Sequence, residues 1–499
     1  MSDLLLVPHP QKLQVHNALV PRPGRVALTV RPTDETVRRD AVRLADDLLD
    51  LAGVEAHIGG DGTPVTLDLD AEGLPAEGYR LSVGPEGVAL VGADPAGLAH
   101  AGQTLLQLLA LANGDLPQLD IRDWPWYRTR ELMLDLGRAP FSMALLKRVV
   151  RIMSRLKLNS LHLHLNDDQL NGLRFERLPL GSENPWAITI DDLRQLVAYA
   201  RSYHVAVVPE IECWGHAGSF VYHEPGLKGG PGMWGGFSFG LGEELFDLLT
   251  RVFDEIVPVL EDRCDVHVGL DEAKWFTLPS VPAENRDDYA PERLVGRLHA
   301  ILQSAGERYG KQVRMRLWAD HGGRPVPEAI RHDVVVEPWR YHEYREAEIR
   351  EKVDQFGGAG KPPFMMGAGM SSEHLQGDFG ATRVWAQAAM DHPNVEGIDL
   401  CLWESNDIAN HLVGIFGGAD HAWTPLTPEV DENDAYRERI RGQTLIRMKK
   451  WQAAFPDADG DAIRRDTGFA VHRGIYTDGP LAGRPVAPTA VIESPESEL

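Results

Sequence analysis

The sequence is poor in cysteine, with only Cys213, Cys264 and Cys401 among its 499 residues. Three cysteines without short spacings form neither a disulfide framework nor a cysteine-based metal site. The chain also lacks any apolar run near the roughly 20 residues that span a bilayer. Its N-terminus, MSDLLLVPHPQKLQV, lacks the basic segment that begins a secretory signal. We therefore expect a cytoplasmic protein without a membrane partner.

Basic residues are scarce relative to acidic ones, with 50 Lys and Arg against 74 Asp and Glu and a net charge of −24. This balance argues against a nucleic-acid partner, because phosphate binding requires a basic surface. The contents of 43% hydrophobic and 25% charged residues are those of an ordinary globular protein. At roughly 150 residues per domain, the length allows about three domains, or one large barrel with additions. Nothing in the sequence indicates the oligomeric state.

Residues 1–123 are predicted to form a small α+β domain. The residue patterns predict two helices packed on a short antiparallel sheet, with no gathering of catalytic residue types. Strands are expected over residues 25–30, 65–69, 79–83 and 87–91, and helices over 34–51 and 96–111. The turn Gly84-Pro85-Glu86-Gly87 should join two of these strands as a hairpin.

From residue 124 to about 425, short apolar runs alternate with amphipathic helical segments. About eight such runs over about 280 residues predict a (β/α)₈ TIM barrel. The runs cover residues 131–134, 161–165, 205–208, 266–268, 313–317, 334–336, 364–366 and 398–402. A doubly wound sheet is the rival, but it requires a glycine-rich turn after its first strand, where this chain has Asp135-Leu136-Gly137-Arg138. Residues 426–499 are expected to form a helical extension and an acidic, disordered tail.

Polar and tryptophan residues follow most of these runs. In a TIM barrel the carboxyl ends of the strands converge on one face, which carries the active site. The residues concerned are Asp135 and Arg138, Asp167 and Asp168, Glu210, Glu212, Trp214 and His216, Asp271 and Glu272, Trp318 and Asp320, Glu337 and Trp339, and Trp403 and Glu404. Carboxylates combined with tryptophans suit an uncharged sugar. No His-x-x-x-His or equivalent spacing is present, so we expect no metal and no cofactor.

Asp271 and Glu272 are the candidate catalytic carboxyls. Glycoside cleavage generally needs one protonated and one ionised carboxyl group. Adjacent residues of a strand point to opposite faces. The pair therefore requires either a bend at the strand end or a mechanism in which the second carboxyl acts through the substrate.

Four ordered segments together resemble glycoside hydrolase family 20, the β-N-acetylhexosaminidases. They are RELMLDLGRAPFS (residues 130–142), LNSLHLHLNDDQ (158–169), VVPEIECWGHA (207–217) and VHVGLDE (266–272). The N-terminal unit also resembles the small domain that precedes the barrel in that family. The resemblance covers most of residues 1–425.

The resemblance implies an exo-acting enzyme that removes terminal β-linked GlcNAc or GalNAc with retention, using the 2-acetamido oxygen of the substrate as nucleophile. Glu272 would be the general acid and base, and Asp271 would orient the acetamide N–H. Substrate-binding residues would be Arg138, Trp318, Trp339, Trp403, Glu404 and Asp320, and the residues that tune Glu272 would be Asp167, Asp168, His216 and Glu210.

The chain departs from the family pattern at several positions. Ala139 follows the binding arginine, Leu270 replaces a glycine, and the final element reads Trp403-Glu404-Ser405. The seventh-strand Tyr-x-Asp is absent from FMMGAGMSS (residues 364–372), with Tyr341 and Tyr344 nearby in sequence. This combination resembles the intracellular, hexosaminidase-D-like branch. It leaves two alternatives open: a catalytically weak hexosamine-binding barrel, and a hydrolase with another aglycone, such as a disaccharide-releasing or glycolipid-trimming enzyme.

Overall fold

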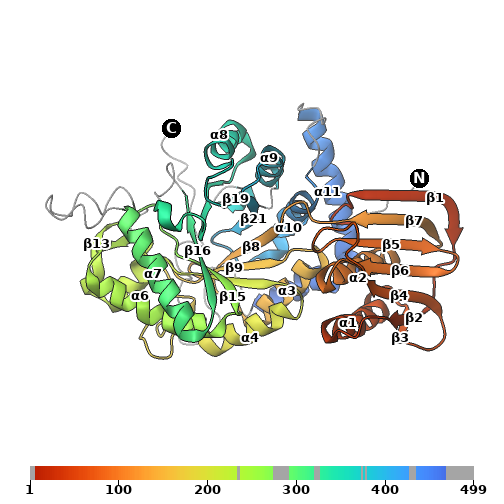
Figure 1. Cartoon of the computed structure of the whole chain (residues 1–499), viewed down its shortest axis with the longest axis horizontal. Helices are drawn as coiled ribbons and strands as arrows, with labels where there is room; N and C mark the ends of the chain where they lie inside the picture. Colours follow the sequence, from red (N-terminus) through yellow and green to blue (C-terminus); the bar gives the residue numbers. More distant parts are fainter. Residues whose placement is uncertain are drawn as a thin grey trace.

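The computed structural model describes residues 6–232, 236–273, 291–319, 326–372, 375–376, 379–425 and 434–467. It shows a seven-stranded N-terminal sheet beside a larger barrel (Figure 1). The predicted fold class, a TIM barrel preceded by a small α+β domain, is confirmed.

The N-terminal sheet is mixed and has the order β1-β7-β5-β6-β4-β2-β3. Its strands are β1 (Lys12–Val20), β2 (Arg25–Val30), β3 (Glu55–Ile58), β4 (Thr63–Leu69), β5 (Tyr79–Gly84), β6 (Gly87–Gly92) and β7 (Leu116–Asp123). The β5–β6 hairpin forms as predicted, but the prediction of a short antiparallel sheet is wrong, because β2 pairs in parallel with both β3 and β4. The edge strands β1 and β3 were missed because they are mostly exposed and carry little apolar alternation.

Two helices, α1 (Glu35–Ala52) and α2 (Pro95–Ala110), pack against each other beside this sheet. The side chain of Asp34 caps α1 by accepting the N–H groups of Thr36 and Val37, and Gly53 ends the helix at φ 61°. Helix α2 contacts β5 and β6 on one side and the barrel helix α3 (Met143–Arg155) on the other. It therefore joins the small domain to the barrel.

A buried ion pair crosses the junction between the two units. Nζ of Lys157 lies 3.0 Å from Oδ2 of Asp123 and 2.8 Å from the hydroxyl of Tyr79. The second oxygen of Asp123 accepts the indole N–H of Trp423 at 2.8 Å. Each of these buried polar groups thus has a partner, so the junction leaves none of them unsatisfied.

Eight parallel strands close into the barrel. In order around it they are β8 (Thr129–Asp135), β9 (Ser160–His164), β12 (Ala206–Glu210), β15 (Arg263–His267), β16 (Gln312–Trp318), β17 (Val334–Glu337), β19 (Phe364–Ser372) and β21 (Val395–Leu402). Pairing of β17 with β19 and of β21 with β8 completes the ring. Each of the eight predicted runs overlaps one of these strands, although Leu165, Val205 and Val268 lie one residue outside them. All five residues of β9 are buried, as expected of a strand covered on both faces.

Helices surround the barrel, and short strands extend its loops. The remaining helices are α4 (Ile190–Arg201), α5 (Gly218–His223), α6 (Glu243–Ile256), α7 (Pro291–Tyr309), α8 (Glu346–Phe356), α9 (Gly380–Ala388) and α10 (Ile408–Trp423). The short strands are β10 (Leu173–Arg174), β11 (Ile188–Thr189), β13 (Lys228–Pro231), β14 (Phe237–Phe239), β18 (Trp339–Arg340) and β20 (Leu375–Gln376).

The C-terminal segment contains α11 (Asp434–Ala454) and α12 (Gly460–Thr467), and α12 packs on α3 and α10. The carboxylate of Asp457 pairs with Arg151 and Arg155 of α3 at 2.9 and 3.0 Å. The predicted acidic tail beyond residue 467 lies outside the described residues. Within the part of the chain that the structure describes, no helix combines the length and apolarity needed to cross a membrane.

Candidate active site

The predicted site residues gather at the carboxyl end of the barrel. Asp135, Glu210 and Trp318 are the last residues of their strands, whereas Asp271 and Glu272 follow β15 closely. Parallel barrel strands all end on one face, so side chains distant in sequence meet there. Asp320 lies outside the described residues.

A sharp turn after β15 brings the two adjacent carboxyls together. Gly269, Leu270 and Glu272 have φ angles of 64°, 79° and 51°. Left-handed backbone at Leu270 and Glu272 costs on the order of 1–2 kcal/mol per residue. This bend meets the requirement inferred from the sequence, because both carboxyls now face His216.

His216 connects the carboxyls that follow β15 with those that follow β9. Its Nε2 lies 3.5 Å from Asp271 and 3.3 Å from Glu272, and its Nδ1 lies 3.4 Å from Asp167 and 3.5 Å from Asp168. Burial opposes a charge on the imidazole, but Asp167 and Asp271 outweigh burial and raise the pKa of His216 well above its usual value. At neutral pH the ring is therefore a cation among acids.

Arg138 is held between two buried carboxylates. Its guanidinium lies 3.0 Å from Asp135 and 2.7 Å from Asp167, and 5.3 Å from the ring centre of Trp403. Asp135 also accepts the backbone N–H of Glu404 at 3.0 Å. Arg138 is thus oriented before any ligand binds, beside an aromatic ring that can stack on a sugar.

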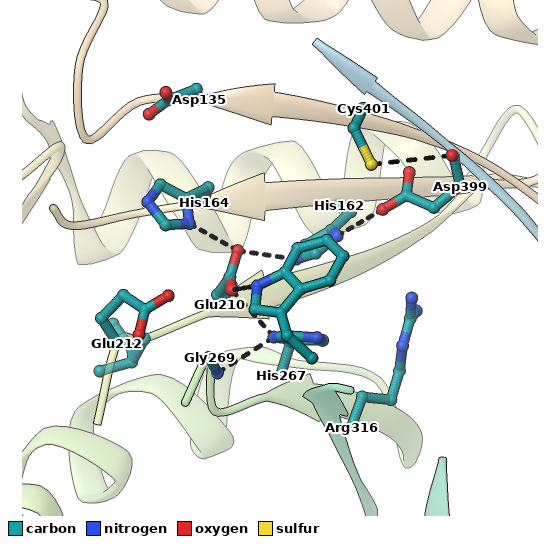
Figure 2. A network of polar contacts seen from close by, with 12 residues as sticks. Asp135, His162, His164, Glu210, Glu212, His267, Gly269, Arg316, Asp399 and Cys401 are labelled. Carbon is teal, nitrogen blue, oxygen red and sulfur yellow. Dashed lines mark hydrogen bonds and ion pairs between the residues drawn. The ribbon is translucent and has the colours of Figure 1, made fainter. Parts of the chain in front are cut away.

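A chain of alternating acids and histidines runs from the barrel interior to this site (Figure 2). Asp399 lies 2.9 Å from His162, whose other nitrogen lies 3.1 Å from Glu210. Glu210 lies 2.6 Å from His164, which in turn lies 2.9 Å from Asp167. Both histidines are fully buried in the barrel interior.

Ion pairs hold this chain of acids and histidines together. Several described trios, such as His162-Glu210-His267 and His216-Asp271-Glu272, have atoms close enough to share an ion. However, burial of His162 and His216 is outweighed by neighbouring carboxylates that raise the pKa of each well above normal. A metal ion at either trio would therefore have to displace the proton of the histidine.

Four aromatic side chains line one side of the site. The ring centres of Trp318 and Trp403 are 5.7 Å apart, and Tyr341 lies 6.4 Å from Trp403. Tyr341 stacks on Trp339 at 5.1 Å with an interplanar angle of 19°. The indole N–H of Trp318 donates to Glu210 at 2.5 Å, so the chain of acids and histidines also fixes the orientation of the Trp318 ring. The three predicted tryptophans are thus brought together.

Tyr341 occupies space that the seventh strand leaves empty. A Cβ on Gly369 of β19 would lie 2.4 Å from Cβ of Tyr341, and one on Gly367 would lie 2.8 Å from Cβ of Trp339. The glycines of the FMMGAGMSS segment therefore make room for aromatic residues of the adjacent β18 and the residue after it. Tyr344, the other nearby tyrosine, is 74% exposed.

Some predicted residues have mainly structural contacts. Oδ1 of Asp168 accepts the backbone N–H groups of Gly218 and Phe237 at 2.8 and 2.9 Å, which anchors the loops after β12. Trp214 is fully buried and belongs to the hydrophobic core rather than to the sugar wall. Glu404 has a φ of 61° and acts electrostatically on Arg138.

Glu212 was predicted to lie on the active-site face, but the sequence assigned it no role. Its side chain is fully buried, and its carboxyl occupies the space above Gly269, where a Cβ would lie 2.1 Å from Oε2. It accepts the backbone N–H of Leu270 at 3.3 Å and contacts Asp271. The signal in the sequence is that Glu212 follows the same predicted strand as Glu210, two residues further on.

Two family models match this chain. Residues 127–355 match the model described as glycosyl hydrolase family 20, catalytic domain, and residues 3–124 match domain 2 of the same family. Together these ranges cover more than two thirds of the chain. The barrel strands β8 to β17 and the whole N-terminal sheet lie within them.

Two curated relatives show the extent of the similarity. A beta-N-acetylhexosaminidase of Cellulomonas fimi is 31% identical over 342 residues, which is 62% of this chain and 65% of that protein. A beta-hexosaminidase of Porphyromonas gingivalis is 26% identical over 365 residues, which is 62% of this chain and 47% of that protein. The chain thus spans about half to two thirds of the length of these relatives.

Solved structures agree in fold. A chitobiase of Flavobacterium johnsoniae superposes with a TM-score of 0.73 at 18% identity, covering 94% of this chain and 75% of that one. An N-acetyl-beta-hexosaminidase of Streptomyces plicatus gives a TM-score of 0.68 at 22% identity, covering 91% and 96%.

Proposed function

Because the chain belongs to glycosyl hydrolase family 20, we propose that it is an exo-acting β-N-acetylhexosaminidase that removes terminal β-linked GlcNAc or GalNAc. The observation that carries this proposal is the pair Asp271 and Glu272 on one bent turn, both facing a charged His216. His216, Asp271 and Glu272 bring side-chain atoms within 4.8 Å of one another. As the family resemblance implies, the nucleophile in this proposal is the 2-acetamido oxygen of the substrate.

The reaction proceeds with retention in two steps. The 2-acetamido oxygen attacks C1, Glu272 donates its proton to the glycosidic oxygen, and the C1–O bond breaks to give an oxazolinium intermediate. Water then attacks C1 while the Glu272 carboxylate accepts its proton, which restores the acetamide and the acid. His216 stabilises the carboxylate form of Glu272 between the two steps.

Asp271 and Tyr341 act on the acetamide in this proposal. The Asp271 carboxylate accepts the acetamide N–H and stabilises positive charge on the oxazolinium ring. Tyr341 takes the part of the family tyrosine that is missing from the seventh strand. Burial raises the pKa of Tyr341 well above its usual value, and the nearby Asp271 adds to the shift. Its hydroxyl therefore stays neutral and donates to the acetamide oxygen.

The remaining side chains bind the sugar or support those that do. Arg138 donates to the hydroxyls at O3 and O4, and Trp318, Trp339 and Trp403 enclose the acetamido methyl group and the ring. Glu404 and Asp320 accept distal hydroxyls. Asp167, Asp168 and Glu210 hold Arg138, His216 and Trp318 in position.

The proposal is tested by release of 4-nitrophenol from the β-GlcNAc, β-GalNAc and β-glucose glycosides. Hydrolysis of either acetamido sugar with none of the glucoside supports participation of the acetamide, and the ratio of the two rates gives the epimer preference. Hydrolysis of the glucoside at a comparable rate contradicts it. Binding of GlcNAc by folded protein without any turnover supports the alternative of a hexosamine-binding barrel.

Two finer predictions go with this function. We propose the intracellular, hexosaminidase-D-like branch from the departures at Ala139, Leu270 and residues 364–372, and a cytoplasmic location follows from that branch. Comparison of rates on soluble chito-oligosaccharides and on glycolipid substrates tests the branch assignment.

A further inference from the structure

Glu212 and Asp271 form a closely packed pair of carboxyls outside the acid–base step just described. Glu212 follows β12, whereas Asp271 lies in the turn after β15. Glu212 is completely buried, and the side chain of Asp271 is 14% exposed. Glycine at position 269 makes this contact possible, because any Cβ there would lie 2.1 Å from the Glu212 carboxyl.

In each of the two carboxyls, one oxygen has a partner and the other has no N–H donor within the described part of the chain. Oε2 of Glu212 accepts the N–H of Leu270 at 3.3 Å, and Oδ2 of Asp271 faces His216 at 3.5 Å. The remaining oxygens, Oε1 of Glu212 and Oδ1 of Asp271, are buried and receive no N–H donor from the described residues. A buried carboxylate oxygen without a donor is costly unless a proton lies between the two groups.

We propose that Glu212 is a neutral carboxylic acid that donates its proton in a hydrogen bond to Asp271 and so positions Asp271 for the acetamide. Glu212 is then a positioning residue, and Asp271 keeps its negative charge and its second oxygen for the substrate. The consequence for turnover rests on the proposed function, whereas the shared proton does not.

The surrounding charges decide which of the two carboxyls holds the proton. The titratable groups that face the pair are Glu210 and His164 from the barrel strands, His216 and Glu272 from the loops, and Tyr341 after β18. Burial and then the carboxylates of Asp271 and Glu210 raise the pKa of Glu212 well above normal. Burial of Asp271 is outweighed by the cationic His216, which lowers its pKa. The proton therefore resides on Glu212.

Infrared difference spectroscopy of the whole protein at neutral pH tests the shared proton directly. Glu212→Gln should remove one carbonyl stretch of a neutral carboxylic acid. Glu255→Gln is the matched control: Glu255 is also buried, but its two oxygens accept the backbone N–H groups of Glu176 and Arg177, so only carboxylate bands should disappear. Loss of carboxylate bands alone in Glu212→Gln would overturn the proposal.

Turnover tests the positioning role. Glu212→Gln retains a donor toward Asp271 and should keep activity within about tenfold, whereas Glu212→Leu removes the donor and should lose roughly a further tenfold to hundredfold. In Glu212→Leu the acid limb of kcat/KM should also move to higher pH, because Asp271 loses a hydrogen bond to its charged form. Equal losses and equal pH profiles in the two variants would refute the positioning role. A wild-type protein that cleaves no hexosaminide contradicts the proposed function and leaves the infrared result standing.

Discussion

Nε2 of His216 lies 3.3 Å from Oε2 of Glu272, and the opposite nitrogen of the same ring faces Asp167. The histidine follows one barrel strand and the glutamate follows the next, so their contact is made by the barrel and not by local sequence. In the proposed mechanism, a positively charged ring at this distance favours the carboxylate that is left when Glu272 donates its proton. Asp167 and Asp271 keep that charge on the ring.

Replacement of His216 by Gln should lower kcat by roughly tenfold to hundredfold, because the positive charge beside Glu272 is lost. The raised pKa of His216 means that it stays protonated as pH rises through about 6.5, where an ordinary histidine is neutralised. The ratio of wild-type to variant kcat should therefore be constant from about pH 5.5 to 7.5. A ratio that falls steeply across this range would show that His216 titrates normally.

Replacement of Glu272 by Gln should reduce turnover by about 100- to 10,000-fold on substrates with poor leaving groups, since protonation of the glycosidic oxygen is lost. The loss should be smaller on aryl glycosides with acidic leaving groups, which need less protonation. Glu86→Gln, in the exposed β5–β6 turn, is the control and should leave rates unchanged. Similar losses across all leaving groups would contradict the general-acid role.

Replacement of Tyr341 by Phe should lower kcat by about tenfold to hundredfold while the aromatic stacking on Trp339 persists. The hydroxyl is the only group removed, so a matching fall in kcat and kcat/KM is expected. Tyr344→Phe, at a 74% exposed position, should change neither constant. If both variants retain full activity, another group positions the acetamide.

The close approach of Gly369 to Tyr341 allows a second, independent test of the role of Tyr341. A methyl group at position 369 would meet Cβ of Tyr341 at 2.4 Å, so Gly369→Ala should displace the ring and depress kcat at least as strongly as Tyr341→Phe. In the double variant, the second change should add little, because both remove the same interaction. Full additivity in this cycle would contradict the predicted coupling.

We expect Glu337 to make the folded protein less stable as pH rises. Burial raises the pKa of Glu337 to about 8, despite the opposing effect of Arg316. The folded protein therefore binds one more proton than the unfolded chain from about pH 4.5 to about pH 8, so the free energy of unfolding falls as pH rises through this range. Glu337→Gln should flatten this part of the urea-unfolding profile. A slope unchanged by the substitution would contradict the raised pKa.

Local residue patterns were sufficient to predict the barrel. Buried parallel strands are nearly continuous apolar runs, so the eight segments from Thr129–Asp135 to Val395–Leu402 were recognisable one by one. The edge strands β1 and β3 were not, because exposed strands carry no such pattern. The mixed pairing of the N-terminal sheet was also missed, since it depends on which strands the α1 crossover places side by side.

The sequence by itself determined the barrel, the acidic and tryptophan-rich face at its carboxyl end, and the Asp271-Glu272 pair, because each strand and the polar residues that follow it can be recognised in a short local segment. Only the tertiary structure decided that Tyr341 fills the space above Gly369, that Glu212 meets Asp271, and that Trp214 belongs to the core. These relationships join segments distant in the chain. They depend on the curvature of the barrel and on close packing, for which no single segment carries a signal.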